Sequence, residues 1–322
     1  MVIGRSVEVS VLVPTYNAGP EFATLLEAIA DQDTDFGYEL LLVDSGSTDG
    51  SLELARRYSA RVLSLPKSRF SHGGARNYGI SEACGDYVAM TVQDAIPADD
   101  SWLRKLVENM AGDEMVAGVY SRQIPRLDCN PFSRYALERH FTNRPKRHVQ
   151  EIESLEHYES LTPMRKLETI TFDDVSSCVR RSVWKEYPFK PVPFGEDLDW
   201  SERVLKAGYK IVYEPRSAVI HSHNRSAFYE MKRAYLAHKL LSRMVGLRLL
   251  PTFKDLRKRL PHVVKHRWKL ARVAGGGPRL YAHAVTRSLG DQAGVFLGGV
   301  VGSDPEGNAV PEFVDRRLST GV

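Results

Sequence analysis

A chain of 322 residues, 43% of them hydrophobic and 26% charged, can bury a substantial core, which excludes an intrinsically disordered protein. The net charge of +4 is unevenly distributed, because residues 1–225 have a net charge of −6 whereas residues 226–322 contain 17 Lys and Arg against seven Asp and Glu. We therefore predict two domains, residues 1–225 and residues 226–322.

The three cysteines, Cys84, Cys129 and Cys178, are far apart and in no spacing typical of a disulfide framework or a metal site. This pattern favours a reducing compartment, so we expect a cytoplasmic protein. The best apolar stretch, residues 293–302, is much shorter than the ~18 residues that a transmembrane helix needs.

Apolar runs alternate with helical patterns along the first 92 residues. We expect strands at residues 7–13, 39–44, 61–65 and 87–92, and helices at residues 21–29, 51–58 and 71–83. This alternation predicts an α/β fold with a parallel, doubly wound sheet.

Three of these predicted strands end in polar residues. The first leads to Thr15 and Asn17, the second ends at Asp44, and the fourth leads to Gln93 and Asp94. Because the carboxyl ends of parallel strands meet at one edge of a sheet, these side chains should converge on one crevice. The convergence predicts a nucleotide or metal site. The glycine patterns of dinucleotide-binding oxidoreductases and of phosphate-cradling loops are missing after the first strand.

Further acids lie in the second half of the first predicted domain. Residues 122–171 are polar and interrupted by prolines. A strand over residues 173–181 begins with Asp173 and Asp174, an acid pair that indicates a surface turn. Residues 194–200 read Phe-Gly-Glu-Asp-Leu-Asp-Trp at the start of an amphipathic helix, where the helix dipole favours acids whether or not they are functional.

The second predicted domain is basic, since residues 231–290 contain 15 Lys and Arg and one acid, Asp255. We expect these bases to lack partners within the protein. A helical pattern over residues 228–245 predicts a mainly helical appendage. Without aromatic interleaving or a recognition motif, nucleic acid is not expected, and the surface suits an anionic membrane better. A solvent-exposed face or a contact in a homo-oligomer is the alternative.

Several motifs in order, over residues 7–225, resemble the family-two glycosyltransferases of GT-A fold. They are Ser-Val-Leu-Val-Pro-Thr-Tyr-Asn at residues 10–17, Leu-Val-Asp-Ser-Gly-Ser-Thr-Asp at 42–49, the strand that leads to Asp94, and the acidic motif at 194–200. More narrowly, residues 70–79, 91–97 and 213–223 look like those of bacterial rhamnosyltransferases that build O-antigen and related surface polysaccharides. The resemblance implies a Rossmann-like, mostly parallel sheet flanked by helices.

The implied function is inverting transfer of a sugar, namely L-rhamnose from dTDP-rhamnose, to a lipid-linked glycan acceptor at the inner face of the cell membrane. A UDP-hexose or UDP-N-acetylhexosamine donor is an alternative. A non-catalytic protein that binds sugar nucleotides or glycans is an alternative of another class.

The resemblance also implies the residues of the donor site. Asp44 should contact the pyrimidine, Gln93 should also lie at the donor nucleotide, and the residues expected to line the nucleotide are Pro14, Thr15 and Tyr16. Asp94 matches the second acid of the Asp-x-Asp signature, which is degenerate here because Gln93 precedes Asp94 and Ala95 follows it. A cofactor Mg²⁺ or Mn²⁺ should then be held by Asp94 with His221 or His223. Cationic phosphate contacts are expected from Arg69, His72 and Arg76, unless Arg76 is a solvent-exposed helix residue.

The resemblance also implies an acceptor side around the acidic motif, with residues 122–171 packed across the site and Asp173 and Asp174 as lesser candidates for acceptor contacts. Asp197 matches the catalytic base, which deprotonates the acceptor hydroxyl as that hydroxyl attacks the anomeric carbon. Glu196 is expected to bind the acceptor or to orient Asp197. Asp199 should brace the helix or contact the acceptor together with Trp200.

Overall fold

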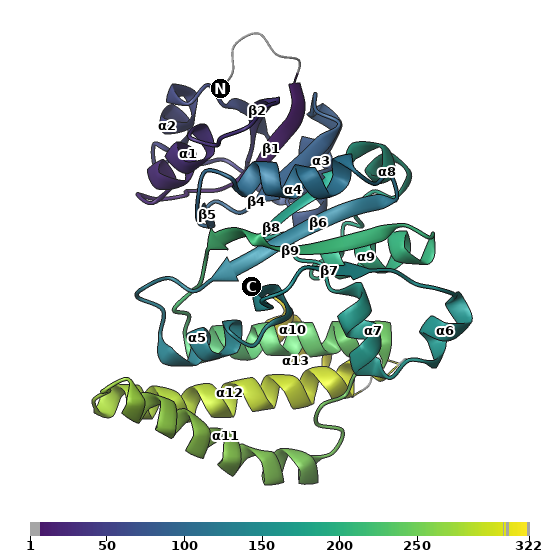
Figure 1. Ribbon diagram of the computed structural model, residues 1–322. Coiled ribbons are helices and arrows are strands. Elements are labelled where there is room, and N and C mark those ends of the chain that lie inside the picture. Colours follow the sequence, from purple (N-terminus) through teal and green to yellow (C-terminus); the bar gives the residue numbers. More distant parts are fainter. Residues whose placement is uncertain (1–6, 305, 307–308, 321–322) are drawn as a thin grey trace. The chain divides into compact units, whose positions relative to one another are not determined.

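The computed structural model describes residues 7–304, 306 and 309–320 and divides into two compact units (Figure 1). The first contains the residues up to Leu127 together with Leu137–Glu159 and Thr169–Ser222. The second contains Asp128–Ala136, Ser160–Glu168 and the residues from His223 onward. The boundary at residue 225 stays a prediction.

The first unit is built on one sheet, which has nine strands among the described residues. The parallel part contains, in spatial order, β3 (Arg61–Ser64), β2 (Gly37–Asp44), β1 (Val7–Thr15) and β4 (Tyr87–Thr91). β8 (Ser176–Arg180) runs antiparallel between β4 and β6 (Val116–Ile124), and β6 pairs in parallel with β9 (Lys210–Ile220). The short strands β5 (Ile96–Pro97) and β7 (His148–Gln150) pair antiparallel with β9.

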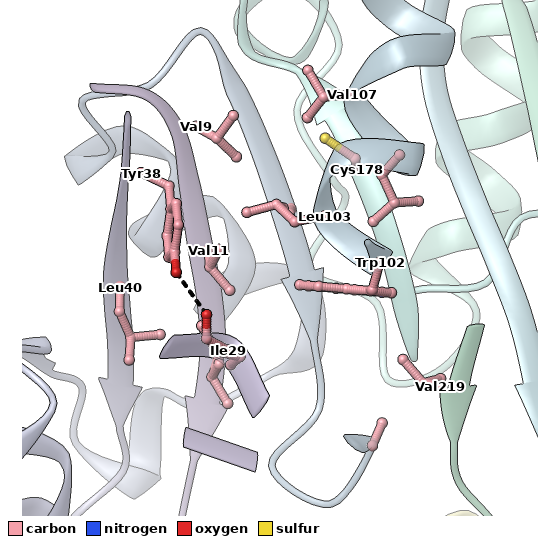
Figure 2. Packing of buried hydrophobic residues seen from close by; sticks show 14 of the residues in the cluster. Val9, Val11, Ile29, Tyr38, Leu40, Trp102, Leu103, Val107, Cys178 and Val219 are labelled. Carbon is pink, nitrogen blue, oxygen red and sulfur yellow. Dashed lines mark hydrogen bonds between the residues drawn. The ribbon is translucent and has the colours of Figure 1, made fainter. Parts of the chain in front are cut away.

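Helices cover both faces of the parallel part of this sheet. α1 (Phe22–Ala30) and α4 (Trp102–Ala111) bury their apolar side chains with the residues of β1 that point to one face, among them Val9 and Val11 (Figure 2). Tyr38 of β2 donates from its hydroxyl to the carbonyl of Ile29 at 2.8 Å, which ties the end of α1 to the sheet. α3 (His72–Glu82) packs against β1 and β2 on the other face, where Gly79 lies against Leu12.

The remaining helices of the first unit are α2 (Ser51–Arg57), α6 (Leu155–Ser160), α8 (Arg181–Glu186) and α9 (Glu196–Lys206), with 3-10 turns at Lys67–Arg69 and Phe141–Asn143. The strands and helices predicted for the first 92 residues are present, with ends that shift by one or two residues. The predicted fold class, an α/β sheet flanked by helices, is confirmed.

The second unit is helical. Its elements are most of α5 (Pro131–Leu137) and α7 (Pro163–Ile170), followed by α10 (Ala227–Val245), α11 (Phe253–Val273), α12 (Pro278–Gly302) and α13 (Glu312–Ser319). α12 packs against α10 and α11, and α13 packs against α10. The predicted mainly helical character of this part of the chain is confirmed. No helix among the described residues is long and apolar enough to cross a membrane.

The backbones of α10 and α12 lie unusually close because α12 presents a glycine at every fourth residue. A Cβ atom at three of these glycines would lie 2.3 Å from a carbonyl oxygen of α10, and at the fourth it would lie 2.8 Å away. The glycines and the residues whose carbonyls they face are Gly290 and Ala227, Gly294 and Met231, Gly298 and Tyr235, and Gly302 and Lys239. Only glycine fits at these positions with the helices as close as they are.

Ion pairs also connect these helices, which corrects one sequence prediction. Arg287, 6% exposed, lies 3.3 Å from Glu230 and 3.0 Å from Asp291. The further pairs are Arg267 with Asp291 and Lys239 with Asp315, the latter at 2.6 Å. The expectation that the bases of residues 231–290 lack internal partners is therefore wrong for Lys239, Arg267 and Arg287. Glu230 and Asp291 directly flank the sequence window and Asp315 lies further along the chain, so a count of acids within residues 231–290 misses all three.

Candidate active site

The structure brings together the three strand ends that were predicted to converge. The loops after β1 and β2 are joined by four hydrogen bonds of 2.8–3.1 Å, each of which uses one backbone N–H. The pairs, donor first, are Asn17 and Ser47, Ala18 and Ser51, Gly19 and Asp49, and Thr48 and the side chain of Asn17. Two loops held in this way form a fixed rim at the carboxyl ends of the strands.

Asp44, predicted to contact a pyrimidine, is 3% exposed and organises the turn that follows β2. Its carboxylate accepts hydrogen bonds from the backbone N–H groups of Gly46 at 2.8 Å and Ser47 at 3.1 Å, and from the Ser47 hydroxyl. Charge-assisted bonds of this kind hold a carboxylate in one orientation. The contact with a base stays a prediction.

Gln93 extends the contact between β1 and β4 beyond the strands. Its Oε1 accepts from the N–H of Tyr16 at 2.8 Å, and its Nε2 donates to the carbonyl of Tyr16 at 3.3 Å. The ring of Tyr16 is 41% exposed, and the ammonium of Lys67 lies 4.3 Å from the ring centroid. The sequence interpretation missed Lys67, although a base just after the end of β3 belongs to the same group of strand-end residues.

Pro14 and Thr15 are the last residues of β1, and the Thr15 hydroxyl is buried and donates to the carbonyl of Val13 at 3.1 Å. Arg69 and His72 are exposed, in the 3-10 turn before α3 and at the first residue of α3. Both side chains therefore stand beside the amino terminus of α3, where the helix dipole favours anions. Loss of hydration lowers the pKa of His72, so Arg69 is the permanent cation of the two.

The predicted metal ligands also come together. Asp94, His221 and His223 each offer one ligand atom, and these atoms all lie within 4.8 Å of one another. Nε2 of His221 lies 3.7 Å from Oδ1 of Asp94. A carboxylate and two imidazoles fit a divalent cation, and the imidazoles favour Mn²⁺ over Mg²⁺, which prefers oxygen ligands.

The acid motif lies at the start of α9, as predicted. Gly195 precedes the helix with φ of +76°, a conformation that glycine adopts without strain. Glu196, the first residue of α9, is buried and pairs with Arg76 of α3. The guanidinium of Arg76 also lies 3.3 Å from the carboxylate of Asp174. One buried cation therefore connects α3, the residues before β8 and α9.

These contacts correct two interpretations. Arg76 is 4% exposed, so it is not a solvent-exposed helix residue, and its guanidinium binds carboxylates. The phosphate contact of Arg76 stays a prediction. Asp174 is 2% exposed and accepts from the Ser177 hydroxyl at 2.8 Å, so it is not part of a surface turn.

The electrostatics of this cluster set Asp197 apart from its neighbours. Burial raises the pKa of Asp174 to about 6, against the lowering effect of Arg76. Loss of hydration, and then the charge of Glu196, raise the pKa of Asp197 well above its ordinary value. Arg76 pairs with Glu196 and Asp174, and the N–H of Leu198 donates to Asp197 at 2.8 Å. A carboxyl with a raised pKa is suited to take up a proton in catalysis.

The last two predicted acceptor residues have structural roles. Asp199 lies 2.8 Å from both Lys190 and Arg203, which braces α9 as one of the two alternatives expected. Trp200 is fully buried, and its indole N–H donates to the carbonyl of Tyr187 at 2.8 Å. The predicted contact of Trp200 with an acceptor is wrong for this conformation, because a buried ring offers no surface to a ligand.

Gln123, next to the end of β6, was missed by the sequence interpretation. Its amide lies 3.1 Å from Nδ1 of His221 and 2.9 Å from the carboxylate of Asp173, which also accepts from the N–H of Val175. The available signal was a polar residue two positions before Pro125, soon after the apolar run of residues 116–120.

The sheet, the strand-end residues and the acid at the start of α9 together define a GT-A glycosyltransferase. A sequence model of the family described as Glycosyl transferase family 2 matches residues 10–186. The chain belongs to this family.

Two relatives carry the same name for their activity. The O-antigen chain rhamnosyltransferase RfbN of Salmonella typhimurium is 30% identical over 232 residues, which cover 71% of this chain and 70% of that protein. The O-antigen chain rhamnosyltransferase WbaN of Salmonella anatum is 29% identical over 231 residues, 70% of each chain.

Solved structures share the fold. One is glucosyl-3-phosphoglycerate synthase from Mycobacterium tuberculosis in complex with Mn²⁺, UDP-glucose and glycerol 3-phosphate, which matches with a TM-score of 0.51 and 21% identity. The match covers 76% of this chain and 81% of that one. At this identity the likeness shows the fold alone.

Proposed function

We propose that this glycosyltransferase transfers L-rhamnose from dTDP-rhamnose to a glycan acceptor of surface polysaccharide synthesis, carried on a lipid. The similarity to the two O-antigen rhamnosyltransferases supports the sugar. The observation that carries the chemistry is that Asp94, His221 and His223 lie together at the strand ends, while Asp197 lies at the start of α9.

In this proposal the nucleotide lies against the rim formed by the loops after β1 and β2, and Asp44 and Tyr16 lie beside its pyrimidine ring. Lys67 and Arg69 add positive charge near the phosphates. Asp197 accepts the proton of the acceptor hydroxyl while its oxygen forms a bond to the anomeric carbon of the sugar. The bond from that carbon to the phosphate oxygen breaks, dTDP leaves with the electron pair, and the configuration inverts.

Asp94, His221 and His223 would hold the divalent cation. When bound, the cation neutralises negative charge that develops on the leaving diphosphate. The donor set of one carboxylate and two imidazoles fits Mn²⁺ better than Mg²⁺, which prefers oxygen ligands. The glucosyl-3-phosphoglycerate synthase structure contains Mn²⁺ with its UDP-sugar, on a similar fold.

A donor screen tests the sugar assignment. Thermal unfolding of the full chain is measured with dTDP-rhamnose, UDP-glucose and UDP-N-acetylglucosamine, each with and without Mn²⁺. Selective, Mn²⁺-dependent stabilisation by dTDP-rhamnose supports the proposal, because a ligand that binds only the folded state raises its stability. Selective stabilisation by a UDP-sugar would contradict the dTDP-rhamnose assignment and favour the UDP-sugar alternative. The solved synthase structure contains UDP-glucose.

Turnover distinguishes a transferase from a non-catalytic binding protein. Release of dTDP from dTDP-rhamnose is followed with lipid-linked oligosaccharide acceptors and, as a control, without acceptor. Acceptor-dependent release supports the transfer reaction. Tight donor binding without any release by the wild-type chain, under conditions where Mn²⁺ binds, would favour the binding-protein alternative.

The proposal places the enzyme at an anionic membrane surface through α11. Ala271 is its one buried residue, and the aromatic side chains of Phe253 and Trp268 are 66% and 49% exposed. Its single acid, Asp255, is engaged in a capping box with Thr252. Its exposed bases are Lys254, Arg257, Lys258, Arg259, Lys265, Lys269 and Arg272. Each basic side chain near an anionic surface contributes about 1 kcal/mol of attraction.

Sedimentation with anionic and with neutral liposomes, over a salt series, tests this part. The variant with Arg257, Lys258, Lys265 and Lys269 changed to Gln should lose most of the salt-sensitive binding. Replacement of the exposed bases Arg56, Arg57 and Lys185 by Gln, on other helices, is the control. Binding that does not depend on lipid charge, or that is unchanged at high salt, would contradict electrostatic anchoring. It would favour a subunit contact as the role of these bases.

A further inference from the structure

Gln123 connects the predicted metal ligands with the acids before β8. Its side chain is buried at 6% exposure, and its position in β6 lies opposite Val219 of β9. His221, which follows β9 and is 9% exposed, is held beside it because the N–H of His221 donates to the carbonyl of Ile124 at 2.9 Å. The contact of Gln123 with His221 therefore rests on the backbone of the sheet.

The directions of the hydrogen bonds follow from chemistry. The amide NH₂ of Gln123 donates to a carboxylate oxygen of Asp173 at 2.9 Å, so the amide oxygen faces His221. An amide oxygen also only accepts, so Nδ1 of His221, 3.1 Å away, carries the proton. The bond to Asp173 thus fixes which way the amide points.

The tautomer of His221 determines what it presents to Asp94. A neutral imidazole has a single N–H, and with that proton on Nδ1 the other nitrogen, Nε2, keeps its lone pair. Nε2 lies 3.7 Å from Oδ1 of Asp94. Two lone-pair donors facing each other at this distance are a suitable pair of ligands for a cation held between them.

We propose that Gln123 is a positioning residue for the divalent cation, because it holds His221 in the tautomer whose Nε2 can bind metal. This inference rests on the metal-dependent function proposed above. Partners of this kind orient a ligand and raise its basicity, and their loss typically lowers metal affinity by about 10- to 100-fold.

Two substitutions separate the contacts of Gln123. Gln123→Met keeps the length of the side chain and removes both hydrogen bonds. Gln123→Glu keeps an acceptor for Nδ1–H of His221 but cannot donate to Asp173. Gln32→Met is the control for the loss of a buried glutamine: Gln32 is 8% exposed, accepts from the N–H of Leu103 at 2.8 Å and donates to the carbonyl of Asp99 at 2.9 Å.

Mn²⁺ binding is measured directly from the electron paramagnetic resonance signal of the free ion, for Mn²⁺ alone and for Mn²⁺ with dTDP. We expect Gln123→Met to weaken Mn²⁺ binding by about 10-fold or more. Gln123→Glu should bind Mn²⁺ at least nearly as well as the wild type, and Gln32→Met should bind like the wild type. Unfolding without metal, compared between the two methionine variants, shows that each folds.

A second readout needs no metal. Long-range ¹H–¹⁵N correlation spectra of the metal-free protein at mildly alkaline pH distinguish the two neutral tautomers of histidine, and His221→Gln identifies the resonances of this ring. The wild type and Gln123→Glu should show a proton on Nδ1, whereas Gln123→Met should show a mixture or the other tautomer.

The outcomes separate this inference from the proposed function. A proton on Nε2 of His221 in the wild type would overturn the inference and leave the metal site standing. Equal Mn²⁺ affinity of the wild type and Gln123→Met would do the same. A wild-type chain that binds no Mn²⁺, with or without dTDP, would overturn both the metal-dependent function and the role of Gln123.

Discussion

The buried cluster around Arg76 offers a sharp test of the site's electrostatics. Arg76→Met keeps most of the side chain's volume and removes the cation. The carboxylates of Asp174 and Glu196, which are 2% and 7% exposed, then lose their counter-charge. Removing one partner of a buried ion pair typically destabilises a protein by about 3–5 kcal/mol.

The expected loss of unfolding free energy lies near the lower end of this range, because the two carboxylates can be neutralised in part by binding a proton. Asp174 has a pKa of about 6, so its protonation near neutral pH costs only about 1.4 kcal/mol per pH unit above that value. We therefore expect Arg76→Met to lower the free energy of unfolding by about 3 kcal/mol near neutral pH.

The loss should depend on pH in one direction. Without Arg76, the pKa of Asp174 in the folded state rises further above its unfolded value, because the cation that lowers it is gone. Stability is then lost as the pH rises through this folded pKa and recovered as the pH falls. The difference between Arg76→Met and the wild type should therefore be smaller at about pH 5 than at about pH 7.5.

Urea unfolding followed by tryptophan fluorescence measures this effect. In a Trp268→Phe background the remaining tryptophans, at positions 102, 184 and 200, all belong to the first unit and report its unfolding. Arg56→Met is the control, because its pair with Glu53 is exposed and such pairs contribute at most about 1 kcal/mol. Adding Glu196→Gln to Arg76→Met should restore part of the stability. A loss below about 1 kcal/mol without pH dependence would refute the buried ion-pair cluster.

Three further predictions concern the reaction and the second unit. Asp197→Asn should lower kcat by about 100-fold or more with nearly unchanged donor affinity. Because the raised pKa keeps Asp197 protonated to a higher pH, kcat of the wild type should rise with pH only above the range of an ordinary aspartate. Loss of donor affinity with kcat intact would exchange the roles of Asp197 and Asp94. Asp94→Asn should weaken donor binding in the presence of Mn²⁺ and leave the Mn²⁺-free binding as it was, as titration calorimetry would show. Gly298→Ala should lower the melting temperature because its Cβ would lie 2.3 Å from the carbonyl of Tyr235, whereas Gly299→Ala, with nothing within 4 Å, should raise it or leave it unchanged.

The sequence predicts the arrangement of the strand ends because each signal there is local. An apolar run followed at once by Asp44, or by Gln93 and Asp94, marks both a strand and its end. The parallel pairing then brings these residues to one edge without further information.

Partners that are distant in the sequence are not predictable in this way. Arg76 lies on a helix at a position that composition alone assigns to solvent, since arginine is rarely fully buried. Its partners Asp174 and Glu196 lie 98 and 120 residues further on. The predicted acceptor contact of Trp200 was wrong for a related reason. The acids beside Trp200 in the sequence suggested a site, whereas its position against Phe172 and Phe189 depends on how α9 packs.

The close contact of α10 and α12 leaves their alignment underdetermined. The glycines of α12 and the carbonyls of α10 repeat with the same step of four residues, so a slip by about one helical turn of 5.4 Å would re-form three of the four contacts. The ion pair of Arg287 with Glu230 does not repeat, because a slip would place Ser226 or Ala234 opposite the guanidinium. The backbone contact therefore stabilises several alignments of the two helices about equally. The buried charges select one of these alignments, as a single polar residue does in a coiled coil.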